Sequence, residues 1–307
     1  MSQDLNVGQT PIQLITDSAS DIPEDMARKR NITIVPLTVS VNGQEYQDGV
    51  SITPPRFYSM MAKKGALPVT SPPAPETFHE IFNGHIGQRD ILGIFISRKM
   101  SNTFDVASQT KMNNYNTYLK QRMAHPQVNK KMQIELIDSR LVSMGATLLV
   151  LEAADKIEAG WPLDKIKDLI NQRINDVKVF FMVDNLDHLV RGGRIGRGSA
   201  LFGKLLGFKP ILGMAGGGVD AKSKSFGGKR AQGKLIEYMK NDLGGTSQPV
   251  RIGICHAGAP EKATTVRNLV QEAFPNQEHY TTYFGPTVGA HTGPGAVGVA
   301  WLPYQEE

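Results

Sequence analysis

Cysteine and long apolar stretches are what this sequence most clearly lacks. Among 307 residues Cys255 is the single cysteine, which excludes an internal disulfide and a cysteine metal cluster. It falls in a strand pattern at residues 251–255, where a buried, unreactive thiol is expected. No run approaches the ~18 apolar residues that span a membrane, and residues 1–10 lack the apolar core of a signal peptide. We therefore expect a cytoplasmic protein without an integral membrane segment.

An excess of charge of one sign is also lacking. The chain has 34 basic and 29 acidic residues, a formal net charge of +5, and the basic residues are scattered along it. Their densest group lies between residues 111 and 131, which we interpret as a solvated, loosely ordered connection. This distribution argues against nucleic acid as a partner, because nucleic-acid-binding proteins concentrate Lys and Arg on one face.

Familiar catalytic signatures are missing as well. His79, Glu80 and His85 do not have the spacing of a zinc-binding helix, and no serine lies in a G-x-S-x-G elbow. Among the seven histidines, His291 lies in a stretch bracketed by glycines that we interpret as a loop, from which it can reach a ligand. The alternative is a structural histidine. The sequence predicts no metal site and no resident cofactor, and His291 is a candidate binding residue.

Strand and helix patterns alternate along the chain. Strands are expected at residues 12–15, 32–41, 91–96, 134–137, 179–183, 211–214, 250–255, 280–284 and 296–302. Helix patterns separate most of the early strands, which is typical of a doubly wound parallel sheet. Because glycine becomes denser after residue 160, we expect an N-terminal doubly wound domain at 10–160 and a C-terminal α/β domain at 161–307.

Two short segments carry strong turn and loop signals. Asn42-Gly43 predicts a two-residue hairpin whose flanking residues pair back on each other. Residues 65–75 contain four prolines, each of which removes a backbone donor. We therefore expect no regular element there, but a stiff loop that presents Thr70 and Ser71.

A glycine-rich loop with two arginines occupies residues 192–199. It follows a strand and a helix for which Asp184 is a candidate cap, and Ser199 is expected to begin a second helix. Two glycines five residues apart, followed by Ser199, resemble a phosphate-binding loop, but the lysine that this motif requires is missing. We favour a tight turn or a docking surface over nucleotide binding. The roles of Arg194, expected to be exposed, and of Arg197 stay open.

Small hydroxyl and carboxyl side chains follow several predicted strands, and ligands of open parallel sheets bind at the carboxyl ends of strands. Backbone N–H groups at helix starts and neutral hydroxyls suit a carboxylate or a phosphate, and no cationic side chain stands among these residues. Each residue could be a helix cap, and their recurrence at several strand ends favours binding. The residues are Thr16, Asp17, Ser18, Thr70, Ser71, Ser97, Ser101, Asp138 and Ser139.

In their order along the chain, these motifs resemble the DegV family of bacterial fatty-acid-binding proteins. The matching segments are residues 16–18 with Asp21, 69–72, Ser97 with 101–103, 138–145, 181–196 and 291–295. They are spread over nearly the whole chain. The resemblance implies a doubly wound N-terminal domain, a C-terminal domain with a mixed sheet, and a long-chain fatty acid buried in a tunnel between the two.

The resemblance also implies roles for individual residues and for partners. The fatty-acid carboxylate would be bound by Thr70, Ser71, Ser101 and His291, supported by Thr16, Asp17, Ser18, Ser97 and Thr103. Arg194 would lie near the surface that meets a separate ATP-dependent fatty acid kinase, related to dihydroxyacetone kinases. The protein would carry the resulting acyl phosphate, which an acyltransferase of phospholipid metabolism uses, and would not itself be an enzyme.

Two residues depart from the family pattern, and one alternative function stays open. Pro72 stands where the pattern has Gln and Asn102 where it has Gly, which leaves chain-length preference and head-group geometry open. The alternative is a phosphoryl-transfer or hydrolytic enzyme that uses the loop at residues 192–199. Binding of ATP or phosphate by the isolated protein would favour this alternative.

Overall fold

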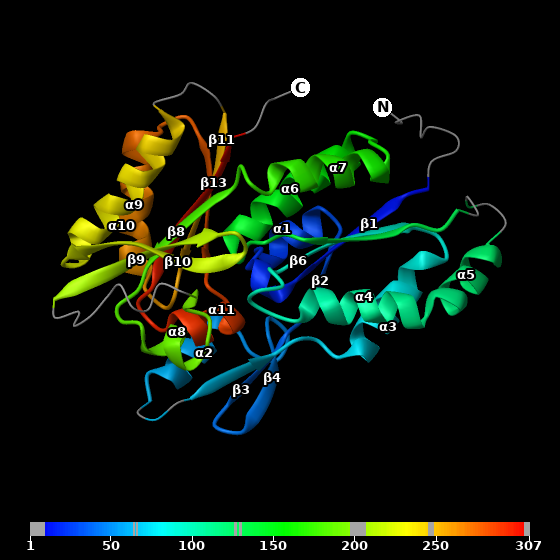
Figure 1. Cartoon of the computed structure of the whole chain (residues 1–307), viewed down its shortest axis with the longest axis horizontal. Helices are drawn as coiled ribbons and strands as arrows, with labels where there is room; N and C mark the ends of the chain where they lie inside the picture. Colours follow the sequence, from blue (N-terminus) through cyan, green and yellow to red (C-terminus); the bar gives the residue numbers. More distant parts are fainter. Residues whose placement is uncertain are drawn as a thin grey trace.

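The computed structural model describes residues 10–63, 65, 67–125, 128, 131–196, 207–244 and 249–303. Arg197, and the helix expected to begin at Ser199, lie outside the described residues. The described chain forms two large sheets and one small sheet, with helices between and around them (Figure 1).

The first large sheet is parallel and belongs to the N-terminal half. Its strands are β1 (Ile12–Asp17), β2 (Ile32–Val35), β6 (Asp90–Phe95) and β7 (Ile134–Asp138), in the order β2-β1-β6-β7. One face is covered by α3 (Pro75–Ile86), α4 (Thr103–Asn113) and α5 (Tyr115–Met123), the other by α6 (Met144–Glu158) and α7 (Leu163–Arg173). Because side chains alternate along a strand, Ile91 and Phe95 face α3 and its neighbours, whereas Leu92 and Ile94 face α6. The predicted parallel sheet with helices on both faces is confirmed.

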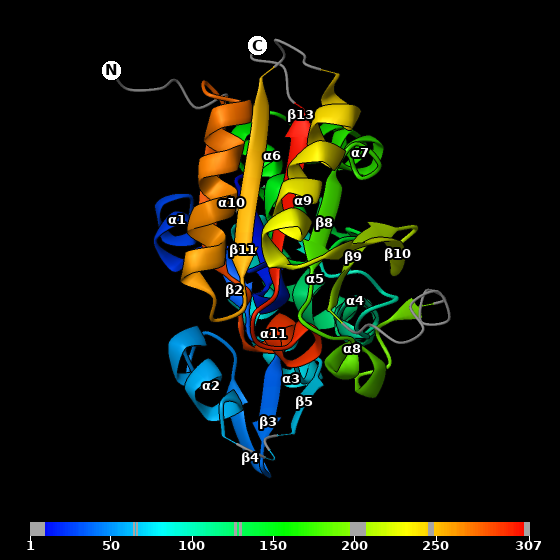
Figure 2. The ribbon, with the colours of Figure 1, turned by 90° about the vertical axis from the view of Figure 1, so that its left-hand side faces the viewer.

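The second large sheet is mixed and belongs to the C-terminal half (Figure 2). Its strands are β8 (Lys178–Met182), β9 (Phe208–Ala215), β10 (Gly218–Phe226), β11 (Val250–His256), β12 (Glu278–Tyr283) and β13 (Val297–Pro303), in the order β10-β9-β8-β13-β11-β12. Only β11 and β12 pair in parallel among the described strands of this sheet. Its outer face is covered by α9 (Gly228–Leu243) and α10 (Pro260–Ala273). The predicted α/β fold with a mixed second sheet is confirmed.

Helix α6 lies between the two large sheets and contacts strands of both. All residues from Met144 to Ala154 are buried, as expected for a helix that is covered on every side. Close approach to the second sheet depends on glycine, because a Cβ at Gly145 would lie 2.4 Å from the Val179 side chain. One core therefore joins the two halves, and the domain boundary near residue 160 stays a prediction.

A small antiparallel sheet corrects two expectations. It consists of β3 (Thr38–Val41), β4 (Gln44–Gln47) and β5 (Pro68–Ser71), in the order β4-β3-β5. The hairpin at Asn42-Gly43 is confirmed, with both residues at positive φ. The range 32–41, expected to contain one strand, contains two, because the chain leaves the first sheet at Pro36 and β3 joins the small sheet. The loop expected at 65–75 is wrong: β5 is an edge strand, and its first position tolerates the missing N–H of Pro68.

Two further expectations do not hold. The connection expected between residues 111 and 131 includes α5, and Arg122 of that helix is fully buried in an ion pair with Asp90 at 2.7 Å. Asp184 makes no capping bond to α8 (Asp187–Arg191); its carboxylate binds the ammonium groups of Lys209 and Lys262.

The remaining helices are α1 (Glu24–Lys29), α2 (Pro54–Met61), α11 (Pro286–Thr292) and a 3-10 turn at Ser18–Ser20. Within the described ranges, no helix is both long and apolar enough to cross a membrane.

Candidate functional site

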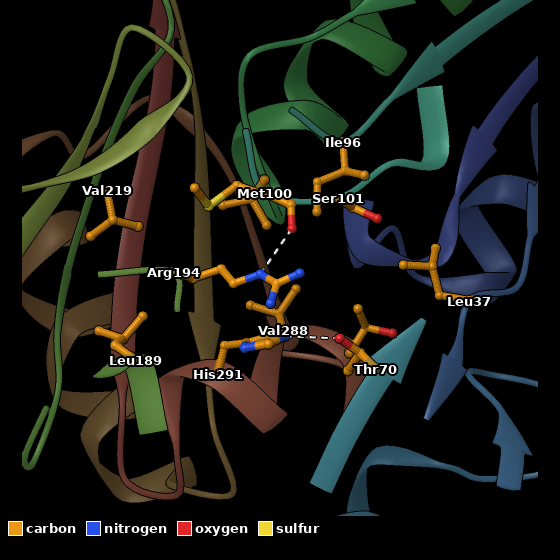
Figure 3. Close-up of a pocket in the computed structure, with 12 residues that line it drawn as sticks. Leu37, Thr70, Ile96, Met100, Ser101, Leu189, Arg194, Val219, Val288 and His291 are labelled. Carbon is orange, nitrogen blue, oxygen red and sulfur yellow. Dashed lines mark hydrogen bonds between the residues drawn. The ribbon is translucent and has the colours of Figure 1, made fainter. Parts of the chain in front are cut away.

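A largely apolar pocket lies where the two halves of the molecule meet (Figure 3). It is formed by residues that follow β2, β6 and β7, together with side chains from β5, α8, β10 and α11. It therefore lies at the carboxyl ends of three parallel strands, the edge at which open sheets bind ligands. The lining residues are Leu37, Thr70, Ile96, Met100, Ser101, Val142, Leu189, Arg194, Val219, Thr287, Val288 and His291.

The structure brings Thr70 and His291 together across 221 positions of sequence. Thr70 Oγ1 lies 2.9 Å from His291 Nε2, at hydrogen-bonding distance. Thr70 points into the pocket because side chains alternate along the edge strand β5. The same alternation leaves Ser71 exposed, and Ser71 does not line the pocket.

His291 lies on α11, so the loop expected around it is wrong. Its Nδ1 atom is buried and has no hydrogen-bond partner among the described residues. Burial first, and then the neighbouring charges of Arg194 and His188, lower the pKa of His291 to about 4. At neutral pH the ring is therefore uncharged, with one N–H donor and one acceptor nitrogen. The ring also packs closely on Gly192, where a Cβ would lie 2.2 Å from Nδ1.

Arg194 is the main departure from the expected site. Its side chain is half-buried and turned inward, with Nε 3.1 Å from the Met100 carbonyl oxygen and Nη1 2.5 Å from that of Gly192. Figure 3 shows the guanidinium between the Met100–Ser101 turn and His291. The expectations of an exposed arginine and of a site without a cation are therefore wrong. The sequence could not reveal this orientation, because a glycine-rich loop does not fix the direction of the side chain.

Ser101 contributes a hydroxyl from the turn that precedes α4. Its Oγ lies 2.8 Å from Thr103 Oγ1, and it accepts a long bond of 3.4 Å from the Thr103 N–H. The N-cap position belongs to Asn102, which makes no side-chain capping bond. Ser101 is therefore a lining residue, and Thr103 lies behind it as its partner.

The other predicted hydroxyl and carboxyl residues lie near the pocket and do not line it. Thr16 Oγ1 donates to the Ile94 carbonyl at 2.8 Å, and Ser97 Oγ donates to that of Gly217 at 2.6 Å. The carboxylate of Asp17 accepts from the N–H groups of Ala19 and Ile96 at 3.0 and 2.7 Å, and Ser18 Oγ accepts from that of Leu37 at 3.0 Å. Ile96 and Leu37 line the pocket, so Asp17 and Ser18 shape its wall through the backbone.

A second, outer pocket opens beside the first. The two pockets share Thr70, Arg194 and His291, which form the polar boundary between them. The outer pocket is lined by Leu67, Pro68, Val69, Thr70, His188, Arg191, Gly192, Arg194, Ala290 and His291. Its basic side chains contrast with the apolar inner wall. In the part of the chain that the structure covers, no cluster of three or more His, Cys, Asp or Glu side chains could hold a metal ion.

The chain is similar to known proteins over nearly its whole length. A DegV domain-containing protein of Caldanaerobacter subterraneus subsp. tengcongensis is 32% identical over 289 residues, covering 94% of this chain and 97% of that protein. The structure of a DegV family protein from Thermus thermophilus, described by its fatty acid binding, has a TM-score of 0.84 at 27% identity and covers 96% of this chain and 100% of that one. The structure of DegV from Bacillus subtilis, described as a fatty acid binding protein, has the same TM-score of 0.84, identity of 27% and coverage of 96% and 100%. The family model described as uncharacterised protein, DegV family, matches residues 11–304, and this chain therefore belongs to the DegV family.

Proposed function

We propose that this protein binds a long-chain fatty acid between its two halves and presents the carboxylate at the polar boundary of the pocket. The observation that carries the proposal is the division of the lining: seven apolar residues on the inner side meet Thr70, Arg194 and His291 on the outer side. The structures of the similar proteins from Thermus thermophilus and Bacillus subtilis are described as fatty acid binding, which supports it. Each buried methylene contributes roughly 0.8 kcal/mol, so a long acyl chain supplies about 10 kcal/mol before the cost of association.

The proposal assigns the carboxylate to Thr70, Ser101 and His291. In the structure the side chains of Thr70 and His291 are hydrogen-bonded to each other. A bound carboxylate can take the place of that bond and accept one hydrogen bond from each of the two side chains. The half-buried guanidinium of Arg194 stabilises a negative charge that would otherwise be costly to desolvate. Ser71 is exposed and lines neither pocket, so the proposal gives it no carboxylate contact.

We further propose that the protein presents the fatty acid to a separate ATP-dependent kinase in the cytoplasm and carries the acyl phosphate to an acyltransferase of phospholipid metabolism. The protein would then act without catalysing the reaction itself. The outer pocket supports this, because its arginines Arg191 and Arg194 suit a phosphate group that forms beside the carboxylate. Arg194 lines both pockets and would couple the bound lipid to the partner.

The direct test is organic extraction of the purified protein followed by mass spectrometry. A stoichiometric fatty acid is expected, and its mass gives the chain length and the number of double bonds. An empty extract from a protein that also takes up no added oleate would overturn the proposal.

The role of Arg194 is tested by Arg194→Ala, with Arg230→Ala, an exposed arginine of α9 that lines neither pocket, as the control. Arg194→Ala is expected to reduce acyl-phosphate formation by the kinase far more than it reduces oleate binding. If the isolated wild-type protein binds ATP and Arg194→Ala abolishes that binding, the alternative enzyme that uses residues 192–199 gains support instead.

A further inference from the structure

Two buried carboxyl groups outside the pocket hold the helix that carries His291. Asp21 Oδ1 accepts a hydrogen bond from the Gly285 N–H at 2.8 Å, and Asp48 Oδ2 accepts one from the Thr287 N–H at 3.0 Å. Both side chains are buried, with 7% and 4% of their surface exposed. They come from positions 264 and 239 residues away, so this contact is purely tertiary.

Helix α11 has no capping side chain of its own. Its N-cap is Gly285, which has no side chain, and the first helical residue is Pro286, which has no N–H. The unpaired N–H groups that begin every helix therefore need acceptors from elsewhere. Asp21 and Asp48 supply them, as an N-cap Asp would in an ordinary helix.

The same helix carries a quarter of the pocket lining. Thr287, Val288 and His291 all line the inner pocket, within six positions of the bonded Gly285. The space at the bond is tight, because a Cβ at Gly285 would lie 2.8 Å from Asp21 Oδ1. A second anchor is Tyr58, whose hydroxyl donates to the Phe284 carbonyl at 2.7 Å. The start of α11 is therefore fixed in place, and the ring of His291 lies at its other end.

We propose that Asp21 and Asp48 are positioning residues for fatty-acid binding, which set the place of His291 by bonding the N-terminal N–H groups of α11. This inference rests on the proposed function, since it concerns how the same pocket is kept ready for a carboxylate. Neither carboxyl lines the inner pocket, so both act through the helix. The groups that face the two carboxyls are Asp17, Ser18, Tyr58, Ser143, Cys255 and Thr287.

The test compares Asp48→Ala with Asp48→Asn, using Asp90→Ala as the control. Asp90 is also a buried carboxyl, and it accepts a hydrogen bond from the backbone N–H of Gln133 at 3.0 Å. It is the first residue of β6, at the end of the strand away from the pocket. Two quantities are measured for each variant: the affinity for oleate and the NMR signals of the His291 ring. Asp48→Ala is expected to shift the ring signals and to weaken oleate binding about tenfold, the equivalent of one charge-assisted hydrogen bond. Asp48→Asn keeps an acceptor oxygen and is expected to retain most of the affinity for oleate and ring signals close to those of the wild type.

Asp90→Ala is expected to lower stability without moving the His291 signals. If Asp48→Ala also lowers stability without moving the His291 signals, and binds oleate as the wild type does, the two carboxyls are structural only and the inference fails. A wild type that does not bind oleate at all would instead overturn the proposed function, and the His291 signals would still report the positioning.

A second measurement needs no variant, and it tests the positioning role of the two carboxyls even if Asp48→Ala does not fold. Coupling between two sites is reciprocal, so bound oleate must tighten the bonds that position His291. Hydrogen exchange at the amides of Gly285 and Thr287 is expected to slow about tenfold more than exchange at the Gln133 amide when oleate binds. Equal slowing at all three amides would contradict the inference.

Discussion

Two sets of small polar side chains lie at the same edge of the parallel sheet, and they differ in what they bond. The first set, Thr16, Asp17, Ser18 and Ser97, bonds backbone groups of neighbouring segments. The second set bonds mainly other side chains, in the pairs Thr70 with His291 and Ser101 with Thr103, and Ser101 also accepts the long backbone bond of 3.4 Å from the Thr103 N–H. Backbone partners cannot be given up without leaving a buried group unsatisfied, whereas a side-chain pair can exchange one bond for a bond to a ligand. The first set is therefore committed to the fold, and the second is available for binding.

The largest effect is expected from removing a member of the first set. Asp17→Ala leaves the N–H groups of Ala19 and Ile96 buried without their acceptor, so the free energy of unfolding should fall by about 3 kcal/mol. Thr70→Ala should change it by less than about 1 kcal/mol. Denaturant unfolding of both variants measures the difference, and equal losses would contradict the division into two sets.

Asp17 should also give the fold a pH dependence opposite in sign to ordinary acid denaturation. Burial is the largest cause that raises the pKa of Asp17, from 3.8 to about 7, against the two backbone bonds that lower it. Between these values the folded state keeps the proton and the unfolded state has lost it. The stability from Asp17 is therefore complete below about pH 4 and is lost as the pH rises through about 7. The free energy of unfolding of the wild type, minus that of Asp17→Asn, should fall over this range, and parallel pH curves would show that Asp17 does not titrate there.

Much of the fold could be predicted from the sequence because local patterns determine it. Continuous apolar runs mark the strands of the parallel sheet, and Asn42-Gly43 marks the hairpin, since each depends on residues within a few positions. Elements whose stability comes from distant partners were missed. Strand β10 is polar or small at residues 220–225 and is held by pairing with β9. Helix α11 contains glycine and proline and is held by Asp21 and Asp48.

The site was predictable to a similar extent. Thr70, Ser101 and His291 could be proposed because the family resemblance depends on short motifs around them, and the structure places all three at one pocket. The direction of Arg194 and the exposure of Ser71 follow from the placement of a loop and an edge strand, which no local pattern specifies. The apolar lining residues, such as Val219 and Leu189, look like ordinary core residues in sequence.

A change next to the second set should affect binding more than the fold. Gly192 has a φ of −74°, so Gly192→Ala causes no backbone strain, but its Cβ would lie 2.2 Å from His291 Nδ1. The ring must move, and oleate binding should weaken roughly thirtyfold because the carboxylate loses a positioned donor. Gly84→Ala is the matched control, because no atom lies within 4 Å of the new Cβ and a helical alanine stabilises by about 0.5–1 kcal/mol. Isothermal titration with oleate compares the two, and equal affinities would mean that the His291 ring does not contact the ligand.

The smallest expected effect separates two neighbouring residues of β5. Thr70→Val keeps the shape of the side chain and removes only the hydroxyl that bonds His291 Nε2, so the affinity for oleate should fall about tenfold with little change in stability. Ser71→Ala removes a hydroxyl one position later on the exposed face of the same edge strand, and it should leave the affinity unchanged. Both residues are short, carry a hydroxyl and lie on the same strand, so the main difference is the direction in which the hydroxyl points. Equal losses from the two variants would mean that the carboxylate lies outside the pocket, against the outer face of β5, whereas a loss from Thr70→Val alone places it at the polar boundary with His291.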